Sequence, residues 1–190
     1  YAMMDQYLAR LDAMGATIAL TADHGMKAKH APTGEPNVIY LEPLLREAGL
    51  ADFRVILPIT DPYVVHHGAL GGFATIYLPD SNDQAQARDV IDAVPGIETV
   101  LTRDRACEVF GLPADRIGDL VVVSTRDHVI GSAPEKHDLS GLKDPLRSHG
   151  GLSEQRVPFI VNRCLDACAT GRRNFDIFSH TLNHAPEGNP

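Results

Sequence analysis

An apolar run that ends in an aspartate and a histidine constrains the fold of this chain more than any other feature. Residues 16–20 are almost entirely apolar, and residues 21–26 read Thr-Ala-Asp-His-Gly-Met. Such a run is typical of a central strand in a parallel sheet, where both faces of the strand are buried. We therefore predict a buried parallel strand over 16–20 and an α/β fold class, with the polar residues at the end of that strand.

Asp23 and His24 are candidate metal ligands because they stand side by side at this strand end. Zinc accepts carboxylate oxygen and imidazole nitrogen at about 2.0–2.2 Å. Gly25 lacks a Cβ, which lets the backbone turn away so that both side chains converge. The alternative is an ordinary hydrogen-bonded pair. A second glycine-flanked histidine, His149, precedes another apolar strand over 157–161 and is a further candidate ligand.

The pattern of the chain predicts a core segment over 1–36, an inserted lobe over 37–142, and a return to the core with a C-terminal helix over 143–190. Within the lobe, short strands and helices alternate, which is typical of a compact α/β unit. Asn37 is a candidate N-cap. We expect a long loop over 131–148. We also expect residues 175, 177 and 178 to form the buried face of the last helix. We predict helices over 2–14, 37–48, 83–93, 103–110 and from 174, and strands over 54–59, 72–78, 97–101 and 119–124.

Composition excludes several classes of partner. The formal net charge is −8 and there is no cluster of basic residues, so we expect neither nucleic acid nor an anionic membrane surface to bind. No apolar run approaches the roughly 20 residues that span a bilayer. No secretory leader is visible, so we expect a cytoplasmic protein, and a homodimer is compatible with this composition.

The cysteines and the C-terminal histidines offer a competing zinc site. There are three cysteines, an odd number that argues against a disulfide framework. Cys164, Cys168, His180 and His184 have a spacing close to that of a zinc finger. The segment between the two cysteines does not suggest the hairpin of a finger, and the two histidines also suit the solvated side of a helix. A non-catalytic, zinc-stabilised module therefore stays an alternative.

The motifs resemble those of the alkaline phosphatase superfamily of two-metal hydrolases. Asp-His-Gly at 23–25 and the later Ser-His-Gly-Gly at 148–151, followed by Val-Pro at 157–158, are similar to the signatures of its phosphodiesterase/pyrophosphatase branch. Residues 36–41, 55–68 and 73–79 resemble the phosphonoacetate hydrolases of this superfamily. The resemblance implies part of an alkaline-phosphatase-like core with a small inserted α/β cap lobe. Because Tyr1 opens directly into a helical pattern, we expect the C-terminal portion of a longer enzyme.

The resemblance also implies a site. It implies two Zn²⁺ per complete active site, with Asp23 and His24 on the ion that holds the nucleophile and His149 on the other. It places a nucleophilic threonine and the remaining ligands upstream of Tyr1, so the missing N-terminal half is an expected partner and this chain alone is expected to be inactive. The implied substrate is a small anionic phosphonate, for which Lys27, Lys29 and His67 are candidate contacts.

The implied reaction is hydrolysis of the C–P bond of phosphonoacetate to acetate and phosphate. Threonine attacks phosphorus, the leaving carbanion is stabilised by its carboxylate, and the phosphothreonine is then hydrolysed. A phosphodiesterase or nucleotide pyrophosphatase of the same superfamily is the alternative enzyme. Such an enzyme shares the metal chemistry but cleaves a P–O bond and needs room for two ester groups.

Overall fold

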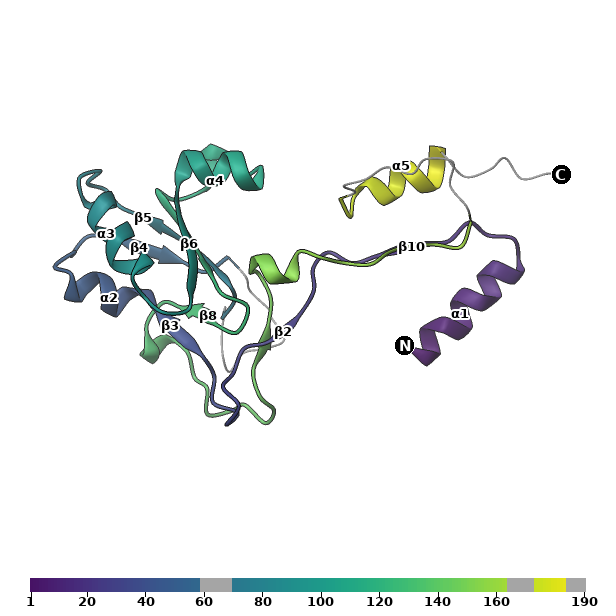
Figure 1. Ribbon diagram of the computed structural model, residues 1–190, viewed down its shortest axis with the longest axis horizontal. Helices are drawn as coiled ribbons and strands as arrows, with labels where there is room; N and C mark the ends of the chain where they lie inside the picture. The colour runs from purple at the N-terminus through teal and green to yellow at the C-terminus, as the bar shows by residue number, and fades with distance from the viewer. Residues whose placement is uncertain (59–69, 164–172, 184–190) are drawn as a thin grey trace. The chain divides into compact units, whose positions relative to one another are not determined.

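The computed structural model describes residues 1–58, 70–163 and 173–183, with the backbone alone at His180 and Asn183. The chain divides into two compact units (Figure 1). Unit 1 contains residues 1–25 and 156–190, and unit 2 contains residues 26–155. The three-part division at residues 36 and 142 stays a prediction. No helix in the described part of the chain is both long and apolar enough to cross a bilayer.

Unit 2 is built on a four-stranded antiparallel sheet with the order β4-β5-β7-β6. The strands are β4 (Arg54–Ile56), β5 (Phe73–Tyr77), β6 (Ile97–Thr102) and β7 (Leu120–Ser124). Three valines and a leucine dominate β7, which lies inside the sheet and is buried along its whole length. The predicted strands over 72–78, 97–101 and 119–124 are therefore confirmed to within two residues at each end.

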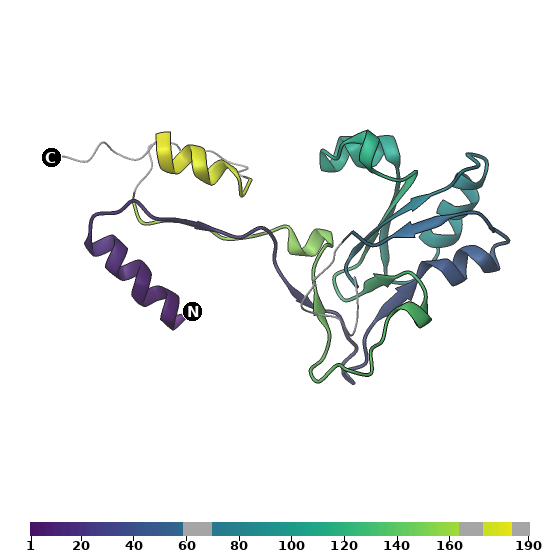
Figure 2. The same ribbon diagram turned by 180° about the vertical axis from the view of Figure 1, so that it is seen from behind.

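The two faces of the sheet bury different sets of side chains, since successive residues of a strand point to opposite sides. Leu120 and Val122 join the larger core cluster with helices α2 (Leu41–Glu47) and α3 (Asp83–Asp92). Val121 and Val123 join a second cluster, which includes residues of α4 (Arg103–Phe110). Figure 2 shows the arrangement from behind, with α2 and α3 away from α4. Helix α4 ends at Gly111, whose φ of +67° suits a residue without a Cβ.

Two small sheets in unit 2 were not expected from the sequence. Strand β3 (Val38–Tyr40) pairs in parallel with β8 (Val129–Gly131), and β2 (Lys27–Ala28) pairs antiparallel with β9 (Arg147–Ser148). The prediction that Asn37 caps a helix is therefore wrong: α2 begins at Leu41, and Asn37 instead donates from its side chain to the carbonyl of Asp127. The apolar residues before Leu41 extend into a strand because β8 offers them backbone partners.

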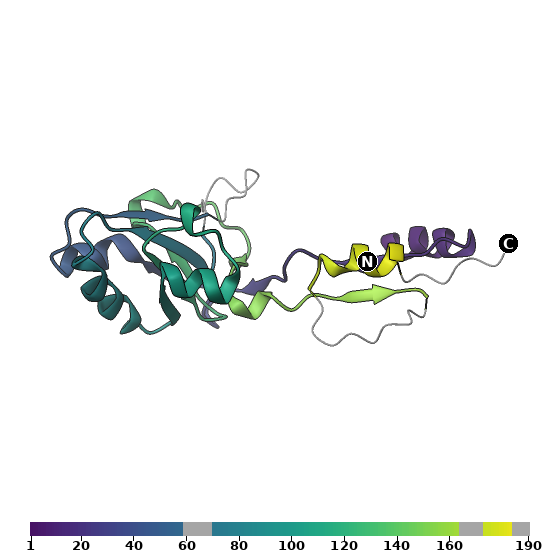
Figure 3. The same ribbon diagram turned by 90° about the horizontal axis from the view of Figure 1, so that it is seen from above.

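The described residues of unit 1 form a two-stranded ribbon and two helices. Helix α1 (Ala2–Ala13) precedes β1 (Ala19–Thr21), which pairs antiparallel with β10 (Phe159–Val161). Helix α5 (Asp176–Asn183) lies beside the ribbon (Figure 3). The predicted parallel pairing is not what the structure shows, because the partner of β1 is the antiparallel β10. The strand is also only partly buried in the described chain.

The C-terminal helix buries less than the sequence predicts. Ile177 is buried, but Phe175 and Phe178 are 58% and 70% exposed. Helix α1 likewise has no buried residue. The spacing of apolar residues correctly predicted both helices. In the described residues of unit 1, it did not predict which side chains of these helices are buried.

Replacing Thr75 with valine is expected to destabilise unit 2. The buried Thr75 hydroxyl accepts a hydrogen bond from the Gly118 backbone N–H at 2.7 Å and donates to the Leu120 carbonyl at 3.3 Å. Valine leaves the buried N–H without this acceptor, which costs roughly 1–3 kcal/mol of unfolding free energy. Chemical denaturation measures the loss, with Thr99→Val at a half-exposed position of β6 as the control. Equal stability of the two variants would contradict the role given to this hydroxyl.

Candidate metal and substrate site

Asp23 and His24 form a compact pair directly after β1 in unit 1. The Asp23 carboxylate accepts a hydrogen bond through Oδ1 from the His24 backbone N–H at 2.9 Å, and its Oδ2 lies 3.4 Å from His24 Nε2. The Asp23 side chain is 84% exposed and that of His24 is 37% exposed. The backbone contact through Oδ1 thus holds the other carboxylate oxygen next to the imidazole.

The Gly25 carbonyl orients the imidazole of His24. His24 Nδ1 lies 2.9 Å from this oxygen. A carbonyl only accepts hydrogen bonds, so the contact requires a proton on Nδ1, and a neutral ring then carries its lone pair on Nε2. A carbonyl that fixes one ring nitrogen in this way is the usual companion of a histidine whose other nitrogen binds a metal.

The pair fits one zinc ion. Two ligand atoms about 2.1 Å from a tetrahedral zinc lie about 3.4 Å apart, and Oδ2 and Nε2 are 3.4 Å apart. With neutral His24, two electron-rich atoms face each other, an arrangement that a cation between them stabilises. With protonated His24, the same distance describes a simple ion pair. The zinc content of the protein distinguishes these two states.

The start of α5 supports the Asp23 loop within unit 1. The Asn174 side-chain amide donates to the carbonyls of Ala22 at 3.2 Å and Asp23 at 3.4 Å. An open depression of about 230 Å³ lies beside them, and Phe175 and Phe178 line its apolar side. The sequence signal for this support was the candidate helix start at Asn174, but its contact with a segment some 150 residues earlier was not visible there.

His149 follows β9 in unit 2, where its backbone is held from two sides. Its carbonyl accepts a hydrogen bond from the Gly72 N–H at 2.7 Å, and the preceding Ser148 hydroxyl donates to the Leu70 carbonyl at 2.6 Å. A Cβ on Gly72 would lie only 2.5 Å from the Gly151 backbone nitrogen. The glycines around His149 therefore allow two backbone segments to approach closely.

The candidate substrate contacts differ in exposure. Lys27 is half-buried on β2, opposite Ser148 of β9. Lys29 is completely buried and its ammonium faces Glu154. His67 lies outside the described residues. A substrate role for these three residues stays a prediction.

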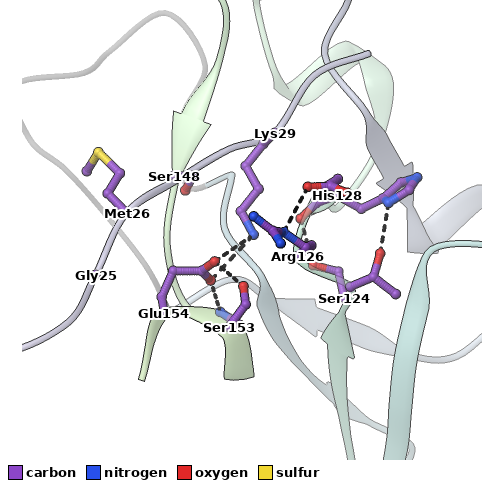
Figure 4. A network of polar contacts seen from close by, with 12 residues as sticks. Gly25, Met26, Lys29, Ser124, Arg126, His128, Ser148, Ser153 and Glu154 are labelled. Carbon is purple, nitrogen blue, oxygen red and sulfur yellow. Dashed lines mark hydrogen bonds and ion pairs between the residues drawn. The ribbon is translucent and has the colours of Figure 1, made fainter. Parts of the chain in front are cut away.

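The buried pair of Lys29 and Glu154 was missed by the sequence analysis (Figure 4). The Lys29 Nζ lies 3.3 Å from Oε1 and 3.4 Å from Oε2, and the two side chains are 0% and 1% exposed. Burial lowers the pKa of Lys29, and the adjacent Glu154 carboxylate opposes that shift. A lysine and a glutamate 125 residues apart carry no local signal that they will meet.

The candidate metal ligands and substrate contacts are divided between the two units, and much of the competing Cys/His set lies outside the described residues. Asp23 and His24 belong to unit 1, whereas His149, Lys27 and Lys29 belong to unit 2. Within the described ranges, no group of three or more His, Cys, Asp or Glu side chains has metal-binding geometry. Of the competing Cys/His set, residues 164, 168 and 184 and the side chain of residue 180 lie outside those ranges.

Comparisons with known proteins agree on one family. A family model described as type I phosphodiesterase / nucleotide pyrophosphatase matches residues 2–152. A phosphonoacetate hydrolase from Penicillium oxalicum is 63% identical over 30 residues, which are 15% of this chain and 42% of that protein. The second match is short, so it supports the resemblance over a limited segment.

Solved structures extend the likeness to nearly the whole chain. The crystal structure of phosphonoacetate hydrolase from Sinorhizobium meliloti 1021 in complex with phosphonoformate is 56% identical with a TM-score of 0.85, and the match covers 93% of this chain and 43% of that one. Its complex with phosphonoacetate gives the same values. Murine ectonucleotide pyrophosphatase / phosphodiesterase 5 matches in fold alone, with 18% identity, a TM-score of 0.50, and coverage of 83% of this chain and 38% of that one.

These matches confirm two predictions from the sequence, the resemblance to phosphonoacetate hydrolases and the alkaline-phosphatase-like fold. This chain spans less than half the length of the relatives it matches.

Proposed function

Since the chain belongs to the type I phosphodiesterase / nucleotide pyrophosphatase family, we propose that it forms part of a zinc-dependent phosphonoacetate hydrolase. The observation that carries this proposal is the 56% identity with a solved phosphonoacetate hydrolase over 93% of the chain. A likeness of that extent is far closer than the 18% identity with the pyrophosphatase relative. The proposed products are acetate and phosphate. Residence in the cytoplasm and a homodimeric state stay predictions.

We assign Asp23 and His24 to one zinc ion and His149 to a second. The 3.4 Å spacing of Oδ2 and Nε2 and the contact of Nδ1 with the Gly25 carbonyl support the first assignment. When bound, a pair of zinc ions neutralises charge that builds on the phosphoryl oxygens and lowers the pKa of the attacking group. The residues of this chain hold the ligand atoms in place; Gly25 and Asn174 keep the Asp23–His24 turn in one conformation.

The proposed bond changes balance without a further reactant besides water. A threonine oxygen attacks phosphorus and the P–C bond breaks, with its electron pair delocalised into the substrate carboxylate until the carbon is protonated to acetate. Water then cleaves the phosphothreonine and releases phosphate. The solved relative is much longer than this chain, and we place the threonine in the additional part of such an enzyme. This chain alone is then expected to be inactive.

An anionic substrate needs local positive charge, because the protein has a net charge of −8. Lys27 is the best-placed candidate among the described residues, since it is half-buried on β2 next to the segment that carries His149. An amine at that position would attract the phosphonate or carboxylate group of the substrate. His67 is a second candidate from the sequence.

Phosphodiester hydrolysis is the alternative function, and the description of the matching family favours it. The two functions share metal ligands but differ in the leaving group, which is a carbanion in one case and an alkoxide in the other. The choice is therefore one of substrate and not of metal chemistry.

Phosphate release by the full-length protein tests the proposal. With added zinc, phosphonoacetate and an aromatic phosphodiester are supplied in parallel at equal concentration. We expect turnover of phosphonoacetate with production of acetate, and loss of turnover after chelation. Turnover of the diester alone would move the protein to the phosphodiesterases, and turnover of neither would contradict both functions.

A further inference from the structure

The buried Lys29–Glu154 pair lies beside the segment that carries His149, and general stability does not explain it. Removing two charges from water costs more than their attraction returns unless further hydrogen bonds satisfy both groups, and apolar side chains of similar volume often serve as well. Lys29 and Glu154 are 0% and 1% exposed. A pair in this position therefore calls for a role that an apolar pair would not fill.

Glu154 accepts hydrogen bonds from the segment that follows His149. Its Oε2 accepts a hydrogen bond from the Gly151 backbone N–H at 2.8 Å, and its Oε1 accepts one from the Ser153 hydroxyl. Gly151 is two residues after His149, and the intervening Gly150 has a φ of +100°. The carboxylate thus closes the turn over residues 151–154 and determines where the backbone goes as it leaves His149.

The backbone of Lys29 is hydrogen-bonded to the segment that precedes His149. Its backbone N–H donates to the Leu146 carbonyl at 2.9 Å, and Lys27 pairs with Ser148 across β2 and β9. Its ammonium, in turn, contacts Glu154. One residue is therefore attached to the chain on both sides of His149, through its backbone before the histidine and through its side chain after it.

We propose that Lys29 and Glu154 are a positioning pair. Through their contacts with the residues before and after His149, they hold its imidazole where a metal ligand is needed. This inference rests on the proposed function, because it assigns the pair a purpose at the metal site. Figure 4 shows the ammonium of Lys29 directed at the carboxylate, with Ser153 on the same side of the carboxylate. The pair acts through His149 and does not touch the reacting atoms.

The test compares a neutral version of this pair with a neutral version of another. Lys29→Met/Glu154→Gln removes both charges together, so no uncompensated charge stays buried. Lys136→Met/Glu42→Gln is the control at a second Lys–Glu pair, in which Lys136 Nζ lies 2.6 Å from the buried Glu42 carboxylate while the Lys136 side chain is 53% exposed and Arg46 also contacts Glu42. Both double variants are made in the full-length protein, and zinc affinity is measured by competition with a chelator.

We expect the Lys29/Glu154 variant to bind zinc about 10–100-fold more weakly, which is the usual effect of removing a group that orients a ligand. Its kcat for phosphonoacetate falls while KM changes little, and the control variant keeps the parent zinc affinity. A raised KM with unchanged zinc affinity would instead make Lys29 a substrate contact. Lowered thermal stability with unchanged zinc affinity and kcat would make the pair purely structural. Either result overturns the proposal.

Hydrogen exchange separates failure of this inference from failure of the proposed function. Backbone amides of residues 146–154 are expected to exchange faster in the Lys29/Glu154 variant than in the parent and the control, whether or not zinc is present. If the parent protein binds no zinc, the proposed function fails, but this comparison still tests whether the Lys29–Glu154 pair holds the His149 segment. Unchanged exchange over 146–154 would show that the pair does not hold the His149 segment.

Discussion

Replacing His24 with alanine is expected to abolish most phosphonoacetate turnover in the full-length protein and to release one zinc ion. The substitution removes the nitrogen that lies 3.4 Å from Asp23 Oδ2. A single carboxylate does not hold zinc in the way that two adjacent ligands do. The loss should exceed the roughly 10–100-fold effect of changing a residue that only orients a ligand. Phosphate release and zinc content of the purified protein measure the two effects.

His30 provides a matched control for His24. Its Nδ1 lies 2.8 Å from the carbonyl of the next residue, Ala31, just as that of His24 lies 2.9 Å from Gly25. Both rings are half-buried. His30→Ala therefore removes the same ring from the same local geometry, and we expect it to retain zinc and turnover. Full zinc content in His24→Ala would show that the Asp23–His24 contact is only an ion pair.

Replacing Gly72 with alanine is expected to destabilise unit 2 and to displace the backbone of His149. The new Cβ would lie 2.5 Å from the Gly151 nitrogen and 2.9 Å from its Cα, so main-chain atoms have to shift. Gly72 also joins β7 to the His149 segment, because its carbonyl accepts from the Ser124 N–H at 2.9 Å and its N–H donates to the His149 carbonyl at 2.7 Å. Overpacking of this kind costs roughly 1–3 kcal/mol, and occasionally more.

Chemical denaturation and zinc content test the Gly72 prediction together. Gly111→Ala adds the same methyl group where no atom lies within 4 Å, so its cost comes from the left-handed backbone at φ +67° alone. We expect both variants to lose stability but only Gly72→Ala to lose zinc. If Gly72→Ala keeps the parent stability and metal content, the close approach at Gly72 does not hold His149.

Local patterns predicted much of the fold because they reflect local physics. The predicted bounds of α1, α3 and α4 agree with the structure to within one residue at each end. The valine run likewise predicted the strand over 119–124, which the structure shows as β7. These local patterns did not predict which strands pair with each other. The extended segments β3 and β8 are short, and each supplies backbone hydrogen-bond partners to the other.

By itself, the sequence determined the family and the fold class, because Asp-His-Gly after an apolar run and Ser-His-Gly-Gly before another are specific combinations of ligand and turn residues. It also singled out Asp23, His24 and His149. Only the tertiary structure decided that Lys29 and Glu154 meet in the interior, that Gly72 touches Gly151, and that β1 pairs antiparallel with β10. These contacts join residues far apart in the chain, and no local propensity encodes a distant partner.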